Sequence, residues 1–472
     1  MIANIFFGTT EEKRDNLTTI MNPYSNKVVS SYPSCTKDDA LKALKIAQKA
    51  SINTKKSNIS QRVAWMEDVA NSLKIEKENI AKTLCDEVGK PISFALVEVD
   101  RCIETIKLSA YAMVNMHGET INTDAMQSGF KTTSFFIREP VGVVACITPF
   151  NFPLNLVAHK IAPALVSGNA VVLKPTPEAP LTAYKLAKIF IESPYAIKDA
   201  LSVVYGDVEV GSALVSSDIP RVLSFTGSVP VGNIITKTAG IKKVALELGG
   251  NAATFIHSSA DLNKAAKRCS FGAFINSGQV CISLQRIYVD ESIYDEFAEK
   301  MKQETLKLKV GSPYETDTFI GPLINEDSLN RAKSWIKNAI DEGAICLTGN
   351  KNDELNFYPT IMSEVTDDMK IICEEVFAPI VSLIKVKSYD EAITKMNNSP
   401  YGLQFSIFTN DLLITQQFID DAICGGVVIN DIPTLRFDIQ PYGGNKLSGI
   451  GKEGPRFTIE EFTEIKSVVI CK

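Results

Sequence analysis

The fold is decided by five short runs rich in β-branched residues: VGVVACI (141–147), NAVVLK (169–174), LSVVYG (201–206), RVLSFTG (221–227) and KKVALEL (242–248). The segments between them have helical patterns that open near Leu154, Pro180, Asp207 and Ser228. Strands that alternate with crossover helices form a parallel sheet covered on both faces. The pattern predicts a doubly wound α/β domain that binds its ligand at the carboxyl ends of the strands.

The rest of the chain falls into three kinds of segment. Residues 37–116 carry apolar residues at spacings of three and four after Thr or Ser caps, which predicts helices. After Gly250 a second αβ series begins, with a helix over 261–276, a strand over 285–290, a helix over 291–308 and further alternation to about 430. The segments 120–139 and 464–472 alternate only in part, as in an exposed hairpin or edge strand that a partner chain covers.

Composition excludes several kinds of function. The 472 residues include 49 Lys and Arg against 55 Asp and Glu, a net charge of −6 that offers no basic surface to nucleic acid. Ten cysteines lie far apart with no C-x-x-C pair, which indicates reduced thiols in the cytoplasm and neither a disulfide frame nor a metal site. Prolines and asparagines interrupt the weakly charged stretch 140–173, so no membrane span is expected.

Three residues are candidates for catalysis. Cys281 lies in NSGQVCISLQR, where a loop can present its sulfur to a cleft as a nucleophile, although a random cysteine is more often buried and inert. Glu247 ends the fifth run and suits a general base, against the alternative of a capping or salt-bridged carboxylate. Asn151 follows the first run in TPFNFPL, where its amide could donate to an oxyanion or simply form a turn.

Other residues are candidates for ligand binding. Gly227 and Ser228 lie where a helix begins, so backbone N–H groups there could bind a phosphate, or the segment is an ordinary turn. Lys174 leaves a strand at the carboxyl edge of the sheet, where it could hold a ribose hydroxyl or phosphate or remain a surface lysine. In EEVFAP, Glu375 could bind a ribose while Phe377 covers a nicotinamide, although a solvated acidic pair is the commoner meaning of two adjacent Glu residues. Among the three histidines, His159 could line a pocket.

Taken together, these segments resemble the aldehyde dehydrogenase superfamily over essentially the whole chain. The matching strings stand in the order of the family: PVGVVACITPFNFPL, LKP, SFTGS, LELGGN, GQVC, EEVFAP, YGL and PYGGNKLSGIGKEG. The resemblance implies that Cys281 is the nucleophile, Glu247 the general base, and Asn151, with the Cys281 backbone N–H, the oxyanion site. It further implies that NAD or NADP is bound by Thr148, Pro149, Phe150, Lys174, Thr176, Gly227, Ser228, Leu248, Gly249, Glu375 and Phe377, and the substrate by His159, Ser283 and Arg436.

The resemblance also carries a domain organisation and an assembly. It implies a Rossmann-like NAD(P)-binding domain over 1–119 and 140–249, a second α/β catalytic domain over 250–440, and a small β oligomerisation arm over 120–139 and 452–472. The expected assembly is a homodimer or homotetramer. The expected chemistry is thiolate attack on an aldehyde, hydride loss to the nicotinamide, and hydrolysis of the resulting thioester by water that Glu247 deprotonates.

The chain departs from the family pattern at three positions. Ala378 replaces a common Gly near the nicotinamide, Pro177 stands where NAD-preferring members often have Glu, and Val280 stands where enzymes of phosphorylated aldehydes often have Arg. Both NAD and NADP therefore remain admissible. The segments CISLQR and INDIPTLRFDIQPYGG look most like the lactaldehyde and non-phosphorylating glyceraldehyde-type branch.

The leading expectation is oxidation of a small hydroxyaldehyde such as lactaldehyde to its acid. Oxidation of succinate semialdehyde is the alternative within the class, and a non-catalytic ligand-binding or structural protein on the same fold is the alternative outside it. Arg436 and Asp438 either bind polar groups of the substrate or pair with each other.

Overall fold

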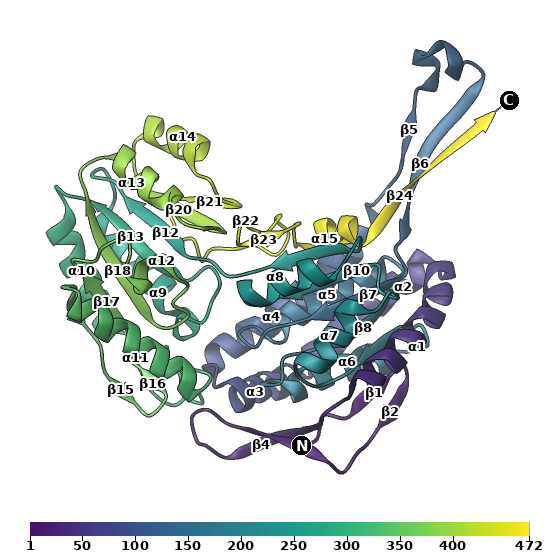
Figure 1. The fold of residues 1–472 in the computed structure, drawn as a ribbon, viewed down its shortest axis with the longest axis horizontal. Helices are drawn as coiled ribbons and strands as arrows, with labels where there is room; N and C mark the ends of the chain where they lie inside the picture. The colour runs from purple at the N-terminus through teal and green to yellow at the C-terminus, as the bar shows by residue number, and fades with distance from the viewer. Residues whose placement is uncertain (472) are drawn as a thin grey trace.

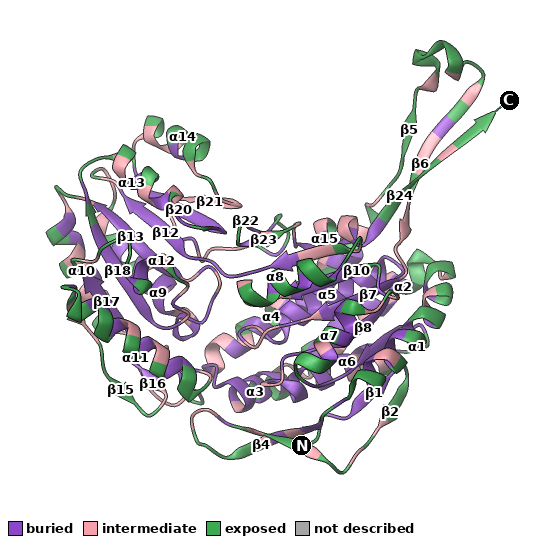
Figure 2. Cartoon of the chain, viewed as in Figure 1, coloured by how far each residue is buried: buried purple, intermediate pink, exposed green. Residues whose placement is uncertain are grey.

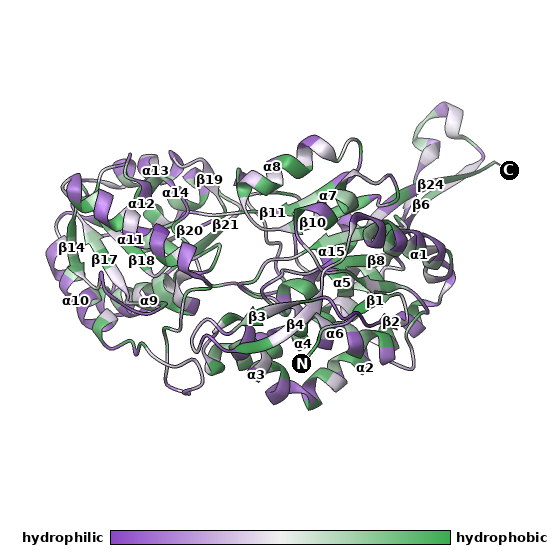
Figure 3. Ribbon diagram, turned by 60° about the horizontal axis from the view of Figure 1, so that its bottom comes forward, coloured by the Kyte–Doolittle hydropathy of each residue, from purple (hydrophilic) through white to green (hydrophobic). Residues whose placement is uncertain are grey.

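The structure is a computed structural model that describes residues 1–471; Lys472, the last residue of the predicted arm, lies outside them. Its two large sheets occupy two separate lobes, and a narrow arm extends away from the lobe that holds the first sheet (Figures 1 and 3). Buried residues concentrate on the strands of both sheets and on the helix faces that cover them (Figure 2). The fold is thus mixed α/β with parallel sheets, as predicted.

The five apolar runs form the parallel strands of the first sheet: β7 (Val143–Ile147), β8 (Ala170–Lys174), β9 (Leu201–Val203), β10 (Val222–Thr226) and β11 (Lys243–Glu247). Their spatial order is β9–β8–β7–β10–β11, so the direction of winding reverses between β7 and β10. Doubly wound sheets bind ligands outside the carboxyl ends of their strands at such a reversal. The loops after β7 and β10 are therefore the expected walls of a ligand site.

Three strands that the sequence did not predict extend this sheet at its edges. These are β1 (Ile5–Phe7) and β2 (Thr10–Glu12) beyond β9, and β23 (Gly449–Ile450) beside β11. The pairing of β23 is antiparallel and brings a segment outside all three predicted domains against the strand that ends in Glu247. The proposed domain bounds themselves remain a prediction.

Helices cover both faces of the first sheet. The crossover helices are α5 (Asn155–Val166), α6 (Pro180–Glu192), α7 (Val208–Ser216) and α8 (Val229–Thr238), and they start where the sequence predicted. The predicted N-terminal helices are α1 (Lys37–Lys56), α2 (Ile59–Ile75), α3 (Lys77–Val88) and α4 (Ile92–Val114), joined by the C-terminal α15 (Pro455–Glu461). Thr36 and Asp39 form a capping box that starts α1. Helix α5 is buried along its whole length, which explains the weakly charged stretch of sequence.

The second lobe contains a seven-stranded sheet in the order β14–β17–β18–β13–β12–β20–β21. Its strands are β12 (Ala252–Ile256), β13 (Leu284–Asp290), β14 (Ile345–Thr348), β17 (Thr360–Ser363), β18 (Ile380–Val386), β20 (Gln404–Phe408) and β21 (Gly426–Ile429). Its helices are α9 (Leu262–Phe274), α10 (Tyr294–Leu306), α11 (Glu326–Asp341), α12 (Lys370–Cys373), α13 (Tyr389–Asn397) and α14 (Leu412–Asp421). All pairs except β14 with β17 are parallel.

The arm is a three-stranded antiparallel sheet. It consists of β5 (Glu119–Ile121), β6 (Thr132–Pro140) and β24 (Thr463–Cys471), with β6 in the middle. Three two-stranded sheets complete the fold: β3 (Leu17–Met21) with β4 (Val28–Pro33), β15 (Asn352–Asp353) with β16 (Asn356–Phe357), and β19 (Tyr401–Gly402) with β22 (Asn445–Lys446). Within residues 1–471, none of the helices has the length and apolar character that crossing a membrane requires.

Candidate active site

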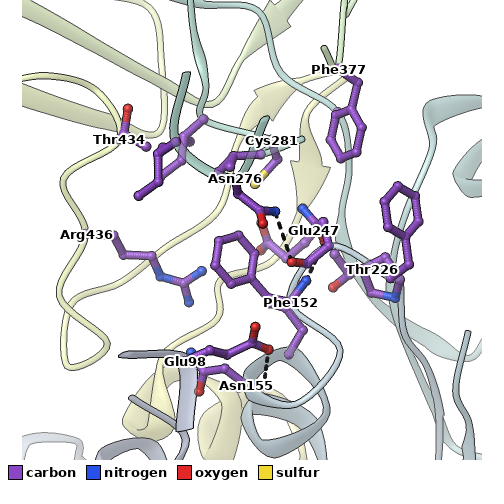
Figure 4. Close-up of a pocket in the computed structure, with 18 of the residues that line it drawn as sticks. Glu98, Phe152, Asn155, Thr226, Glu247, Asn276, Cys281, Phe377, Thr434 and Arg436 are labelled. Atoms are coloured by element: carbon purple, nitrogen blue, oxygen red, sulfur yellow. Dashed lines mark hydrogen bonds between the residues drawn. The ribbon is translucent and has the colours of Figure 1, made fainter. Parts of the chain in front are cut away.

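A cavity of about 630 Å³ lies at the carboxyl edge of the first sheet and faces the second lobe. It brings together eleven of the seventeen site residues predicted from the sequence: Pro149, Phe150, Asn151, Gly227, Ser228, Glu247, Leu248, Gly249, Cys281, Glu375 and Phe377. Arg436, a twelfth, also lines it. In the close-up view, Cys281 and Glu247 lie between Arg436 on one side and Phe377 on the other (Figure 4).

Cys281 reaches the cavity on a loop that only a glycine permits. The loop connects α9 to β13 and places Gly278 at a φ of 70°, and a Cβ there would lie 2.2 Å from the carbonyl oxygen of Ala378. The sulfur of Cys281 lies 2.9 Å from the hydroxyl of Tyr442. Burial raises the pKa of the thiol to about 11, and the hydrogen bond with Tyr442 acts in the opposite direction. The resting group is therefore a thiol that needs help to ionise.

Asn151 keeps the donor end of its side chain free. The backbone carbonyl of Asn151 accepts hydrogen bonds from Lys90 Nζ at 2.7 Å and from Asn276 Nδ2 at 3.3 Å. The side-chain Oδ1 accepts one from the backbone N–H of Phe152 at 3.1 Å. Within residues 1–471 its Nδ2 has no acceptor, while the residue lines the cavity. Lys90 is itself fixed by a buried ion pair with Glu98. A preorganised amide of this kind can stabilise a developing oxyanion.

Glu247 ends β11 with a carboxylate that is only partly satisfied. Its Oε2 is buried without a hydrogen-bond partner among the described residues. A Cβ on Gly443, whose φ is +152°, would lie 2.7 Å from the Glu247 Oε1, so a larger residue would crowd the carboxylate. Burial raises the pKa of Glu247 well above its ordinary value, and Glu453 adds to this, whereas Arg436 and Lys160 oppose it. A carboxylate of raised pKa is suited to take a proton from water.

The opposite side of the cavity fits a nicotinamide nucleotide. Glu375 accepts a hydrogen bond from the backbone of Gly250 at 3.0 Å, and burial raises its pKa to about 7. A Cβ on Gly249 would lie 2.5 Å from the Glu375 carboxylate, so the chain must approach it closely. The rings of Phe150 and Phe377 meet edge to face at 5.9 Å between centroids. A carboxylate for ribose hydroxyls beside flat aromatic walls matches the shape and polarity of such a group.

The start of α8 suits the phosphate groups of the same nucleotide. Gly227 and Ser228 line the cavity and precede its first residue. The Gly227 N–H donates to the Glu247 backbone carbonyl at 3.0 Å, so the N–H groups of the first turn of α8 and the positive end of its dipole are what an anion would meet here. The hydroxyl of Thr226, also on the wall, is buried without a partner among the described residues. Thr226 thus leaves a hydroxyl open to a bound nucleotide.

Three predicted cofactor residues lie at the same sheet edge but outside the cavity wall. Lys174 ends β8 and hydrogen-bonds to the Pro175 carbonyl at 3.3 Å, and burial lowers its pKa. Thr176 follows it and donates to Glu178. Thr148 follows β7, and its hydroxyl is buried without a partner within residues 1–471. Their role in binding the nucleotide remains a prediction.

Two predicted substrate residues lie behind the wall. His159 is fully buried in α5, and its Nε2 lies 3.0 Å from Asp438 Oδ1. Ser283 donates to the Ala273 carbonyl at 3.1 Å and does not line the cavity. The expectation that His159 lines a pocket is therefore corrected: because α5 is buried on all sides, its imidazole faces the loop that carries Arg436.

Arg436 and Asp438 lie close together on the loop behind and beside the cavity. Asp438 is held by Arg101, at 2.7 and 3.0 Å, and by His159. The guanidinium of Arg436 is 3.6 Å from Asp438 and 3.8 Å from Glu453, and it faces the cavity. Arg436 and Asp438 thus pair with each other, one of the two alternatives, and Arg436 also lines the cavity.

Sequence reasoning missed Lys90, Asn276 and Tyr442. Lys90 fixes the carbonyl of Asn151, Asn276 contacts the same carbonyl, and Tyr442 contacts the sulfur. Tyr442 stands in the quoted string PYGGNKLSGIGKEG, but nothing local marks it as a neighbour of a cysteine 161 positions away. Only the folded chain shows these contacts.

A doubly wound sheet whose carboxyl edge faces a thiol, an amide donor and a carboxylate across a cavity fits an enzyme that binds a nucleotide cofactor there. The model of the aldehyde dehydrogenase family matches residues 9–468, and the chain belongs to that family. It is an NAD(P)-dependent aldehyde dehydrogenase.

Several relatives match the chain over nearly its whole length. It is 42% identical over 471 residues to a 3-sulfolactaldehyde dehydrogenase of Priestia aryabhattai. This alignment covers 100% of this chain and 97% of that protein. It is 41% identical over 460 residues to a lactaldehyde dehydrogenase of Methanocaldococcus jannaschii, and the alignment covers 96% of this chain and 97% of that protein. An aldehyde dehydrogenase of Physcomitrella patens in complex with the reaction product succinate matches at a TM-score of 0.97 with 36% identity, covering 100% and 98%.

Proposed function

We propose that the chain oxidises a small hydroxyaldehyde, lactaldehyde or a similar compound, to its carboxylic acid with NAD or NADP. The observation that carries the proposal is the meeting of Cys281, Asn151 and Glu247 on one cavity wall. The relatives named for lactaldehyde and 3-sulfolactaldehyde support the substrate class, since both compounds are small hydroxyaldehydes.

The chemistry follows from where these groups lie. The Cys281 thiolate attacks the aldehyde carbon, and the oxygen of the thiohemiacetal accepts hydrogen bonds from Asn151 Nδ2 and the Cys281 backbone N–H. When bound, the oxidised nicotinamide supplies the acceptor for the hydride that leaves this carbon. Glu247 then takes a proton from the water that hydrolyses the thioester, which releases the acid and restores the thiol.

Arg436 is the residue that we propose for the polar end of the substrate. Its side chain lines the cavity, and within residues 1–471 its charge is matched only at 3.6 Å by Asp438 and at 3.8 Å by Glu453. Such a donor suits a hydroxyl group and also an acidic group. Succinate semialdehyde therefore stays as the alternative within the class, supported by the succinate complex of the Physcomitrella patens relative.

A panel of aldehydes with both cofactors tests the proposal. Lactaldehyde, glycolaldehyde, 3-sulfolactaldehyde, glyceraldehyde 3-phosphate and succinate semialdehyde are each compared by kcat/KM from the appearance of reduced nicotinamide. We expect a hydroxyaldehyde to give the highest value. An equal or higher value for succinate semialdehyde would overturn the substrate, and cofactor binding without turnover of any aldehyde would favour the non-catalytic alternative.

We further propose that the chain assembles into a homodimer or homotetramer through its arm. Ile121, Ile465 and Val469 are exposed apolar residues on the strands of the arm, where β5 and β24 both have a free edge. Light scattering should give a mass of at least twice the 51.6 kDa of one chain. A monomer at micromolar concentration would contradict this assembly.

The cytoplasm is the proposed location. All ten cysteines are unpaired, and five of them are buried. Unpaired thiols persist in a reducing compartment.

A further inference from the structure

Tyr442 is the one described side chain that hydrogen-bonds the sulfur of Cys281. Its hydroxyl lies 2.9 Å from the sulfur, and the residue is 6% exposed. The backbone of Tyr442 exchanges two hydrogen bonds with Glu453, at 2.9 and 2.6 Å. The guanidinium carbon of Arg436 lies 3.7 Å from the centre of the Tyr442 ring. The hydroxyl is therefore held in place through both its backbone and its ring.

The ionisation states decide which atom donates. Burial raises the pKa of Tyr442 well above its ordinary value, so the hydroxyl keeps its proton at neutral pH. A thiolate has no proton to give, so in the reactive state the hydrogen bond must run from the Tyr442 hydroxyl to the sulfur. The charged groups that face the sulfur are Glu375 and Glu247, which disfavour the thiolate, and Arg436, which favours it.

We propose that Tyr442 is a catalytic residue: its hydroxyl donates a hydrogen bond to the Cys281 thiolate, which orients the sulfur toward the aldehyde and increases the fraction ionised. The cation over the ring strengthens the hydroxyl as a donor, since Arg436 stabilises negative charge on it. The proposal rests on the assignment of Cys281 as the nucleophile.

The size of the effect follows from the strength of the bond. A hydrogen bond to a charged group shifts an ionisation by about tenfold or more. A thiolate that loses this bond is also more nucleophilic, by about threefold for a tenfold change in acidity. Removing the hydroxyl should therefore lower the rate of Cys281 alkylation about threefold while most of the sulfur is still protonated.

The test compares Tyr442→Phe with Tyr205→Phe. Phenylalanine keeps the ring that packs against Arg436 and removes only the hydroxyl. Tyr205 is a matched control, because it is fully buried in the first lobe and its hydroxyl has no hydrogen-bond partner among the described residues. Each protein is alkylated with iodoacetamide between about pH 6 and pH 10, and the Cys281 peptide is quantified by mass spectrometry.

We expect Tyr442→Phe to be alkylated about threefold more slowly across this range, because Cys281, whose pKa is raised to about 11, stays mostly protonated throughout it. The Tyr205→Phe profile should superimpose on that of the unchanged protein. Superimposable profiles for Tyr442→Phe, or an equal decrease in the control, would overturn the proposal. The measurement uses no aldehyde, so a failed aldehyde panel with separated profiles would reject the proposed function and leave the role of Tyr442 intact.

Discussion

Cys281→Ser is expected to lose aldehyde oxidation by at least roughly 10⁴-fold in kcat, because removal of a covalent nucleophile costs up to about 10⁶-fold. Serine preserves the size of the side chain, but its hydroxyl is far less acidic than a thiol and ionises too rarely to attack an aldehyde. The cavity compounds this loss, since burial disfavours any anion at position 281. Steady-state formation of reduced nicotinamide with the best aldehyde of the panel measures the effect.

Cys346→Ser is the matched control for this experiment. Cys346 lies on β14 at the far edge of the second sheet, and its thiol donates to the Thr348 carbonyl at 3.3 Å, a bond that serine can also form. Its activity should equal that of the unchanged protein. Nucleotide binding by Cys281→Ser, followed by fluorescence, shows that the variant is folded. Unchanged turnover in a folded Cys281→Ser would remove Cys281 as the nucleophile.

Glu247→Gln is expected to separate the two halves of the reaction. Hydride loss does not require this carboxylate, so about one equivalent of reduced nicotinamide should still appear rapidly per site. Hydrolysis of the thioester then lacks its base, and the steady-state rate should fall by about 10²- to 10⁴-fold. Rapid mixing shows the burst, and intact-protein mass spectrometry shows the acyl group that remains on the enzyme.

The rate of thioester hydrolysis should depend on pH through the ionisation of Glu247. Burial raises the pKa of Glu247, so the carboxyl is protonated and inactive as a base at low pH, and hydrolysis should speed up as pH rises through that pKa. The variant should lose this rise. Hydroxylamine, which attacks a thioester without a base, should restore turnover. Loss of the burst as well would move the role of Glu247 to the step before hydride loss.

Much of the fold could be predicted because its signals are local. The strands β7, β8, β10 and β11 are apolar runs of five residues, and the crossover helices begin at positions that cap or initiate helices. The strands β2 and β23 could not be predicted, since two or three residues carry no readable pattern. Their pairing depends on an edge that exists only once the sheet has formed.

The residues of the site also differ in whether the sequence could predict them. Asn151 and Glu247 could be found because Asn151 follows β7 and Glu247 ends β11, and the carboxyl ends of the strands in a predicted parallel sheet meet at one edge. His159 was predicted to line a pocket, but α5 buries it against Asp438. The hydrogen bond between Tyr442 and Cys281 joins two loops that no periodicity relates.

The amino-acid sequence by itself determined the order of strands and helices and the chemical groups at the strand ends, because both depend on residues close together in the chain. Only the tertiary structure decided which groups share the cavity and in which protonation state they rest. Cys281, Glu247 and Tyr442 acquire raised pKa values only when segments from both lobes exclude water from them. Burial and contacts across hundreds of residues are products of packing, which is why the reactivity of this site is a property of the folded chain.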